Sequence, residues 1–354
     1  MPATSPPRTR WARLRVWWAR RPPGDGAAVM ATGIISVGLH ETGHETLSRI
    51  ALVLTAVAWL GLAADFVVRL LRERVRWLAE ACTPGALTAV AATTVLGTRL
   101  TALGRQEVAE ALLALSAVLW PGLLFLVVRH FRPRMPGAVF LGCVATQGLA
   151  VLGAVLATVT HADWLAHTAL VLFWLGIVLY VVALLCFDFR EVATGAGDHW
   201  IAGGALAISA LAGSKLIAAH HVNVYLWNDD DSGVLRAVTL ALAVLALGWY
   251  GVLVLAELGW PRPRYDVRRW ATVFPMGMTA AAALSVAAAA GVPWLRGTGQ
   301  VLLWIAVAAW LAVAAGAVAS AAGGGSSGGE GTPGGEGSPG SGESAGTVRS
   351  RGPR

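Results

Sequence analysis

The sequence predicts an all-α integral membrane protein with ten transmembrane helices. Hydrophobic residues make up 56% of the 354-residue chain and charged residues 13%, where an average soluble domain carries about 25% charged residues. The mean hydropathy is +0.63. The charges are clustered, and the apolar segments between them are each close to the roughly 20 residues that a helix needs to cross hydrocarbon. These observations exclude soluble, disulfide-stapled and fibrous proteins.

The ten apolar segments form one predicted transmembrane domain over residues 25–321. The first segment is the shortest. We expect helices at 25–40, 47–70, 83–103, 107–129, 136–159, 164–186, 199–221, 233–257, 270–291 and 298–321.

The two ends of the chain differ from this domain in composition. Residues 1–24 are rich in Arg, Trp and Pro, and no apolar stretch of a cleavable signal peptide precedes Pro22 and Pro23. This basic segment fits either an interfacial segment on anionic lipid or a disordered tail. Residues 322–354 are rich in Gly, Ser, Pro and Glu, which predicts a disordered tail.

The distribution of basic residues predicts the orientation of the chain. With the N-terminus inside, 21 of the 27 Lys and Arg residues fall in inside segments. The outside loops then hold only Arg49, Arg99, Arg105 and Arg296. By the positive-inside rule both termini are cytoplasmic, in a cell (inner or plasma) membrane, which agrees with an even number of crossings. Because the Arg residues lie in short loops, the net charge of +7 indicates topology rather than nucleic-acid binding.

The segments alternate in character, as in five consecutive helical hairpins. Odd-numbered segments carry Gly, Ser and Thr, whereas even-numbered ones are mostly Leu, Val and Ala. Since polar side chains face lipid only at a cost, we expect the odd helices inside and the even helices as the lipid wall. A short repeat supports equivalent positions around one axis. Pro-Gly-Ala opens the third segment at 84–86 and the fifth at 136–138, and Thr94 and Thr146 each follow ten residues after the Pro.

The odd segments predict a narrow pathway for anions. They contain no acidic residue, whereas Asp and Glu rings mark cation pores. The alternative is that small residues only allow close helix packing. Lys215 can instead extend to the membrane interface. The candidate lining residues are Thr32, Gly33, Thr94, Thr146, Ser209, Thr279 and Lys215.

The ninth segment contains a candidate gate. Pro275 lies in its first half, where a proline frees a backbone carbonyl and bends the helix. Phe274 stands beside this bend, and its ring would block or dewet a pathway of small residues. The alternative is a packed or lipid-facing Phe at an ordinary kink.

Three short motifs resemble the tellurite-resistance/C4-dicarboxylate transporter (TDT) family, which includes TehA-like proteins and slow anion channels. They are Trp270-xxx-Phe274-Pro275-Met276, the opening Ala28-Val29-Met30-Ala31-Thr32-Gly33-Ile34-Ile35-Ser36, and Asp198-His199-Trp200-Ile201-Ala202-Gly203-Gly204-Ala205. The resemblance implies five hairpins around a pseudo-fivefold central pore lined by the odd helices, and a homotrimer with one pore per protomer. It also implies that the occluding phenylalanine of the family corresponds to Phe274.

A competing motif lies between the first two segments. His40-Glu41-Thr42-Gly43-His44 matches HExxH, which in metalloproteases supplies two zinc ligands and a general base from one helix. Here we expect it in an outside loop, with Gly43 disfavouring a helix. His40, Glu41 and His44 are therefore weak metal candidates, and a zinc-dependent membrane protease is an alternative function.

Other polar residues gather at the two ends of the segments. One group of His and Asp residues is expected at the outer side, where it could form a metal-binding or pH-sensing vestibule or could simply lie in solvated loops. If the group senses pH, transport should have its midpoint near an external pH of about 6 to 7. This group comprises His40, His44, His161, His167, His220, His221 and Asp229–Asp231. At the inner end of the second segment, Asp65 and Arg69 are spaced for an i,i+4 ion pair. Cys82, Cys143 and Cys186 show no CxxC spacing and are expected to be packing residues.

The sequence therefore predicts transmembrane transport of small anions rather than an enzyme. Chloride, nitrate, sulfite, tellurite, malate and succinate all fit a pathway lined by hydroxyl groups, and the residues do not separate a channel from a proton-coupled carrier. No Walker motif indicates an ATP motor, and no cofactor is expected. A membrane scaffold or sensor without transport is a further alternative.

Overall fold

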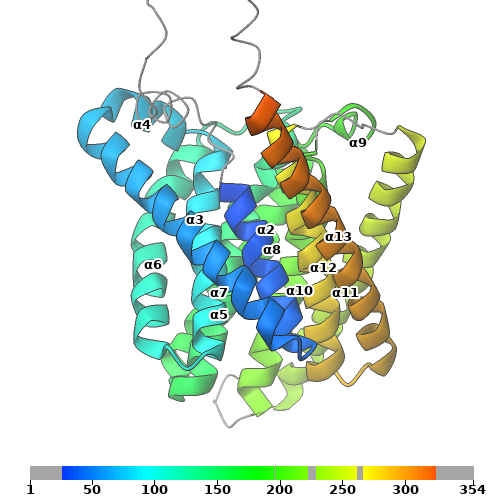
Figure 1. The fold of residues 1–354 in the computed structure, drawn as a ribbon. Coiled ribbons are helices and arrows are strands. Elements are labelled where there is room, and N and C mark those ends of the chain that lie inside the picture. Colours follow the sequence, from blue (N-terminus) through cyan, green and yellow to red (C-terminus); the bar gives the residue numbers. More distant parts are fainter. Residues whose placement is uncertain (1–25, 196, 222–228, 261–265, 324–354) are drawn as a thin grey trace, which may run out of the picture.

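The structure is a computed structural model that describes residues 26–195, 197–221, 229–260 and 266–323, and its long elements are helices (Figure 1). Within these ranges the only β-type pairing is an isolated bridge between Met135 and Phe187. The predicted basic segment 1–24 lies outside the described residues, as does the predicted tail from residue 324 on. The chain is thus an all-α membrane protein, as predicted.

The long helices follow one another as five antiparallel pairs. The pairs are α2 (Gly26–Glu41) with α3 (Glu45–Arg72), α5 (Thr88–Ala102) with α6 (Gln106–Val128), α7 (Leu141–Thr160) with α8 (Asp163–Cys186), α10 (Trp200–His221) with α11 (Asp229–Gly259), and α12 (Trp270–Ala289) with α13 (Pro293–Gly323). Short helices α4 (Arg74–Ala81) and α9 (Glu191–Thr194) and the 3₁₀ turns η2 (Pro84–Leu87), η3 (Gly137–Phe140) and η4 (Val267–Arg269) connect successive pairs.

Eight of the described helices are long and apolar enough to cross a membrane by themselves. The other two of the predicted ten are shorter, because α2 has 16 residues and α5 has 15 after the four-residue turn η2. The last helix begins at Pro293 rather than at the predicted 298. Proline is favoured in the first turn of a helix, since its missing N–H has no partner there in any case.

The two members of each pair differ sharply in burial. In the spanning stretches of α7, α10 and α12, 94%, 89% and 89% of the residues are buried. The corresponding shares in α3, α6, α8, α11 and α13 lie between 11% and 33%. The inner helices are therefore the odd segments of the sequence and the outer helices the even ones, which confirms the predicted alternation.

The inner helices form a closed ring. Following the chain, α2 packs against α5, α5 against α7, α7 against α10 and α10 against α12, and α12 returns to α2. Each outer helix packs against its own inner partner. Side chains of the ring form the core, while large Leu, Val, Phe and Trp residues of the outer helices are exposed.

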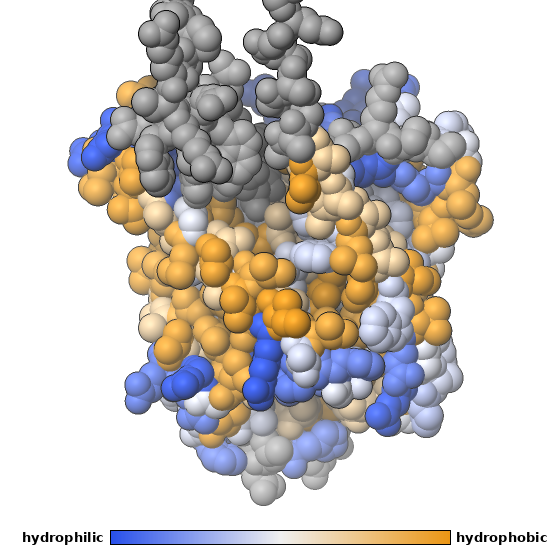
Figure 2. Space-filling model, viewed as in Figure 1, coloured by the Kyte–Doolittle hydropathy of each residue, from blue (hydrophilic) through white to orange (hydrophobic). Residues whose placement is uncertain are grey.

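The ring has two distinct ends. The described turns within the pairs lie at one end, here called the hairpin end, and α2 begins and α13 finishes at the other, here called the termini end (Figure 1). On the face drawn in Figure 2, an apolar band crosses the middle of the bundle, and more hydrophilic residues lie at its lower end and at the two sides of its upper end. This band is what a bilayer would cover.

Candidate functional site

A small cavity lies where all five inner helices meet. The volume that the centre of a water molecule can occupy in it is about 10 Å³, which is roughly enough for one water. Its lining residues are Ile34 and Val37 of α2, Thr94, Val95 and Thr98 of α5, Gly148 and Val151 of α7, Ile208 and Leu211 of α10, and Met278 of α12. The centre of the ring is therefore closely packed and mostly apolar, with two threonines from α5.

Phe274 lies on the face of α12 that points toward the centre of the ring. Pro275 packs against α10, and Gly277 packs against α2. Because successive helix residues are turned by about 100°, Phe274 and Met278 project between these two directions, which is toward the axis. Phe274 is 2% exposed. It lies one helix turn from the cavity-lining Met278, nearer the termini end.

Pro275 lies inside α12 and is closely packed. A Cβ added at Gly204 of α10 would stand 2.9 Å from Pro275 Cγ, so this position leaves room for the proline ring only as glycine. Thr279 Oγ1 donates to the Pro275 carbonyl oxygen at 2.9 Å. The proline thus sits at the contact between two inner helices, beside the axis-facing phenylalanine.

The predicted hydroxyl lining is only partly at the cavity. Thr94 lines it and lies directly against Gly148 of α7, where any Cβ would collide with the threonine hydroxyl. Ser209 faces Cys143 at the contact between α10 and α7, with 3.8 Å between oxygen and sulfur. Gly33 faces Val95. These positions lie within the ring, and the described cavity reaches Thr94 and Val95 but not Ser209.

Thr32 and Thr146 face the outer helices instead of the cavity. Three tryptophans of outer helices each donate an indole N–H to a threonine of an inner helix at 2.9 Å. These pairs are Trp59–Thr93, Trp120–Thr146 and Trp310–Thr32. The repeat of Thr94 and Thr146 in the sequence is accordingly not an equivalence in space, because Thr93 rather than Thr94 is the counterpart of Thr146.

The hairpin end carries charged groups whose partners the sequence did not predict. Lys215 of α10 donates to Glu41 Oε1 of α2 at 2.8 Å. Glu41 is the last residue of α2, one position beyond the predicted end of that segment, so an inner helix does carry a carboxylate. Both side chains are about one fifth exposed, at 21% and 19%. Lys215 thus bridges two inner helices near the mouth of the ring.

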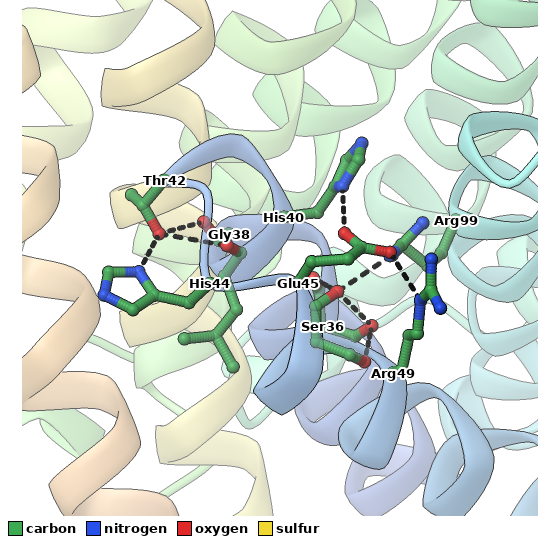
Figure 3. A network of polar contacts seen from close by, with 10 residues as sticks. Ser36, Gly38, His40, Thr42, His44, Glu45, Arg49 and Arg99 are labelled. Carbon is green, nitrogen blue, oxygen red and sulfur yellow. Dashed lines mark hydrogen bonds and ion pairs between the residues drawn. The ribbon is translucent and has the colours of Figure 1, made fainter.

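Arg99 is a buried part of the hairpin end, which corrects its predicted place in an outside loop. It lies in α5 and is 1% exposed. Its Nε donates to Ser48 Oγ at 2.9 Å and its Nη2 to Glu45 Oε1 at 2.8 Å. Ser48 and Ser36 exchange hydrogen bonds at 2.6 and 2.7 Å and so join α3 to α2 (Figure 3). The position of Arg99 inside the predicted apolar segment 83–103 was the signal that could have revealed this buried network.

The HExxH motif is divided between two elements. His40 and Glu41 end α2, Gly43 makes the turn at φ +83°, and His44 precedes α3. His40 Nδ1 is 2.7 Å from Glu45 Oε2, and His44 packs edge-on against Trp304. Figure 3 shows the two imidazoles on opposite sides of the turn. Because the two histidines do not share a helix face, the arrangement does not fit a zinc site of the HExxH type.

The remaining polar predictions have separate outcomes. Among the described residues, no three His, Cys, Asp or Glu side chains come together as a metal site. His161 and His167 are exposed or partly exposed at the hairpin end, and the side chains of Asp229–Asp231 lie outside the described residues. The predicted pair of Asp65 and Arg69 is confirmed at 2.8 Å. Arg69 also bonds Glu80 of α4 at 2.7 Å, which the spacing did not predict.

At the termini end, the segment before α10 joins two inner helices. Gly137 of η3 packs directly on the Asp198 carbonyl, so no side chain fits there. Burial raises the pKa of the Asp198 carboxyl above its ordinary value, opposed by the nearby charge of Arg268. His199 is fully buried. The Asp-His-Trp motif of the sequence is therefore a packed junction between the start of α7 and the start of α10.

Two comparisons with known proteins bear on the identity of the chain. The family model described as "Voltage-dependent anion channel" matches residues 22–318, which is most of the sequence. It covers the described structure from the start of α2 to residue 318 within α13. No curated protein matches the chain.

Proposed function

The chain belongs to the voltage-dependent anion channel family, and from this premise we propose that it moves small anions along the axis of the five-helix ring with Phe274 as the gate. The family consists of anion channels and transporters. The finer statements below concern this chain and rest on its own residues.

The observation that carries the proposal is that Phe274 is buried on the same face of α12 as the cavity-lining Met278. We take this face to place its ring on the path along the axis. In this position an aromatic ring stops ion passage by filling the path and by excluding water. Movement of the ring, permitted by the weakened backbone bonding around Pro275, would open the path.

The lining of the cavity supports anions over cations. None of the described residues around it is acidic, and two of them are threonines. Thr94 Oγ1 donates to the Ala91 carbonyl at 2.9 Å, and Thr98 Oγ1 donates to the Thr94 carbonyl at 2.9 Å. In the closed ring both hydroxyl protons are therefore engaged. An anion that enters the ring would accept these hydroxyl protons in place of the backbone carbonyls.

The remaining parts of the proposal follow from the same reasoning. The protein lies in the cell membrane with its termini end toward the cytoplasm, because basic residues gather at that end. They are Arg69, Arg72, Arg129 and Arg190. The protein forms a homotrimer with one path in each protomer, as the family resemblance implies. The transported anions belong to the halide and nitrate, sulfite and tellurite, or C4-dicarboxylate classes.

The test is anion flux in proteoliposomes under an imposed voltage, comparing the wild type with Phe274→Ala. Chloride, nitrate, sulfite and malate serve as probes. We expect flux to rise at least tenfold in Phe274→Ala for several of these anions, because the substitution removes the ring from the axis.

The matched control is Phe173→Ala. Phe173 is also fully buried, but it lies on the outer helix α8, where its carbonyl accepts a bond from Gln147. It therefore reports what loss of a buried ring does without opening the axis. Equal flux in all three proteins would reject Phe274 as the gate.

A further inference from the structure

A second and larger cavity lies between the inner helix α5 and the outer helices α3 and α6. Its volume is about 270 Å³, close to the smallest pockets that hold small molecules, at about 300 Å³. Short helix α4 and turn η2 close it toward the termini end. Trp59, Phe66 and Trp77 contribute aromatic surface, and Phe66 and Trp77 contact each other edge to face at 5.6 Å.

This lateral cavity opens toward the lipid-facing surface rather than toward the ring axis. Two of its lining residues, Val67 and Leu115, are 50% and 41% exposed on outer helices. Both lie among the exposed apolar side chains of outer helices that are long enough to cross a membrane. A mostly apolar cavity in this place is open to hydrocarbon, and water gains little there because it finds few polar partners.

The polar part of the lateral cavity is confined to one end. Arg69 Nε lies 2.8 Å from Asp65 Oδ2, and its Nη1 lies 2.7 Å from Glu80 Oε2. All three residues line the cavity. Arg72 follows three residues later on α3 and is exposed. The cavity is thus amphipathic, apolar along its length and charged with both signs where α3 leaves the membrane.

From this arrangement we propose that the lateral cavity binds one acyl chain of a membrane phospholipid, with its zwitterionic head at Asp65, Arg69 and Glu80. The hydrocarbon chain replaces an empty apolar space in contact with lipid, which is favourable in proportion to the apolar area covered. The phosphate of the head lies near the positive charge of Arg69, and its ammonium group lies near the carboxylates of Asp65 and Glu80.

The lateral cavity is also joined to the ring. Trp59 lines it and donates its indole N–H to Thr93 of α5 at 2.9 Å. Thr93 precedes Thr94, which lines the central cavity. A bound acyl chain would therefore press on the inner helix that contributes both cavity threonines, and so tie the position of α5 to the surrounding lipid. The binding itself stands independently of the proposed anion path.

The first test is the phospholipid that stays bound through purification. Ala63 lines the lateral cavity, whereas its neighbour Ala64 is exposed to lipid. Wild type, Ala63→Phe and Ala64→Phe are purified in mild detergent, washed, and assayed for phospholipid per chain by mass spectrometry. We expect Ala63→Phe to lose about one phospholipid per chain relative to the other two. Equal retention in all three would overturn the proposal.

A second measurement uses the wild type alone and does not depend on any variant folding. The protein is reconstituted with a phosphatidylethanolamine whose acyl chain carries a photoreactive diazirine, and the labelled peptides are mapped. We expect labelling concentrated several-fold in residues 59–69 and 85–93 over the lipid-facing stretches of α8 and α11. Labelling spread evenly over all outer helices would overturn the proposal, and neither result depends on whether anions pass through the ring.

Discussion

The inner ring and the outer helices of this protein hold together in different ways. Ring helices approach closely through small residues, as where Gly148 meets Thr94. Outer helices are joined to them by single hydrogen bonds from tryptophan, as between Trp120 and Thr146. In a bilayer lipid is as apolar as leucine, so helix association depends on close packing and on polar contacts rather than on hydrophobic burial. We therefore expect the ring to be sensitive to added volume, and its attachment to the outer helices to be sensitive to the loss of hydrogen bonds.

The largest loss of stability is expected for substitution of Arg99, a buried residue of the ring. Arg99 and Arg49 bond the same oxygen, Glu45 Oε1, at 2.8 and 3.0 Å. Arg99 is on an inner helix with 1% of its side chain exposed, and Arg49 is on an outer helix with 65% exposed. Arg99→Met removes two hydrogen bonds of a buried charged donor, to Ser48 and Glu45, and should cost on the order of 3 kcal/mol even though Arg49 still pairs with Glu45. Arg49→Met should cost less than about 1 kcal/mol.

Thermal unfolding of the purified variants in detergent, followed by size-exclusion chromatography with fluorescence detection, measures this difference. Arg99→Met should lose its folded peak at a markedly lower temperature than Arg49→Met. If both variants melt like the wild type, the network at the hairpin end does not stabilise the ring.

An intermediate effect is expected when a side chain is added to the ring. Gly148→Leu introduces a side chain where even a Cβ collides with Thr94, whereas nothing lies within 4 Å of the Cβ position at Gly122 on outer helix α6. Overpacking of this kind should cost about 1–3 kcal/mol. The same substitution at Gly122 should be neutral or slightly stabilising, because leucine is the better helix former. The same thermal unfolding measurement compares the two variants, and equal stability would show that the ring tolerates added volume.

The smallest loss of stability is expected when a tryptophan–threonine hydrogen bond between an outer helix and the ring is removed. Trp120→Phe keeps most of the ring surface but removes the donor to Thr146, and Thr146→Val removes the acceptor. A double-mutant cycle should return a coupling of about 0.5–1.5 kcal/mol. A coupling of zero in the same stability measurement would mean that packing alone attaches the outer helix.

Much of the fold could be predicted from the sequence, because the membrane imposes simple rules on composition. Apolar length determined where the helices run, and the alternation of small polar with large apolar residues determined which are inside. Pro275 and Phe274 stood out because a proline bend beside an aromatic residue is conspicuous in a segment of small residues. The direction of each hydroxyl could not be predicted in this way, since neighbours such as Thr93 and Thr94 differ only by the rotation of one residue on a helix.

What the sequence by itself determined is therefore the class, the pairing of the helices and the inner or outer place of each, since these follow from the free energy of transferring side chains into lipid. Only the tertiary structure decided which groups meet. It buried Arg99 against Glu45, joined Lys215 to Glu41, divided the HExxH residues across a turn, and opened a lateral cavity at Ala63. Such contacts join residues far apart in the chain, and their partners follow from the packing of helices rather than from any local pattern.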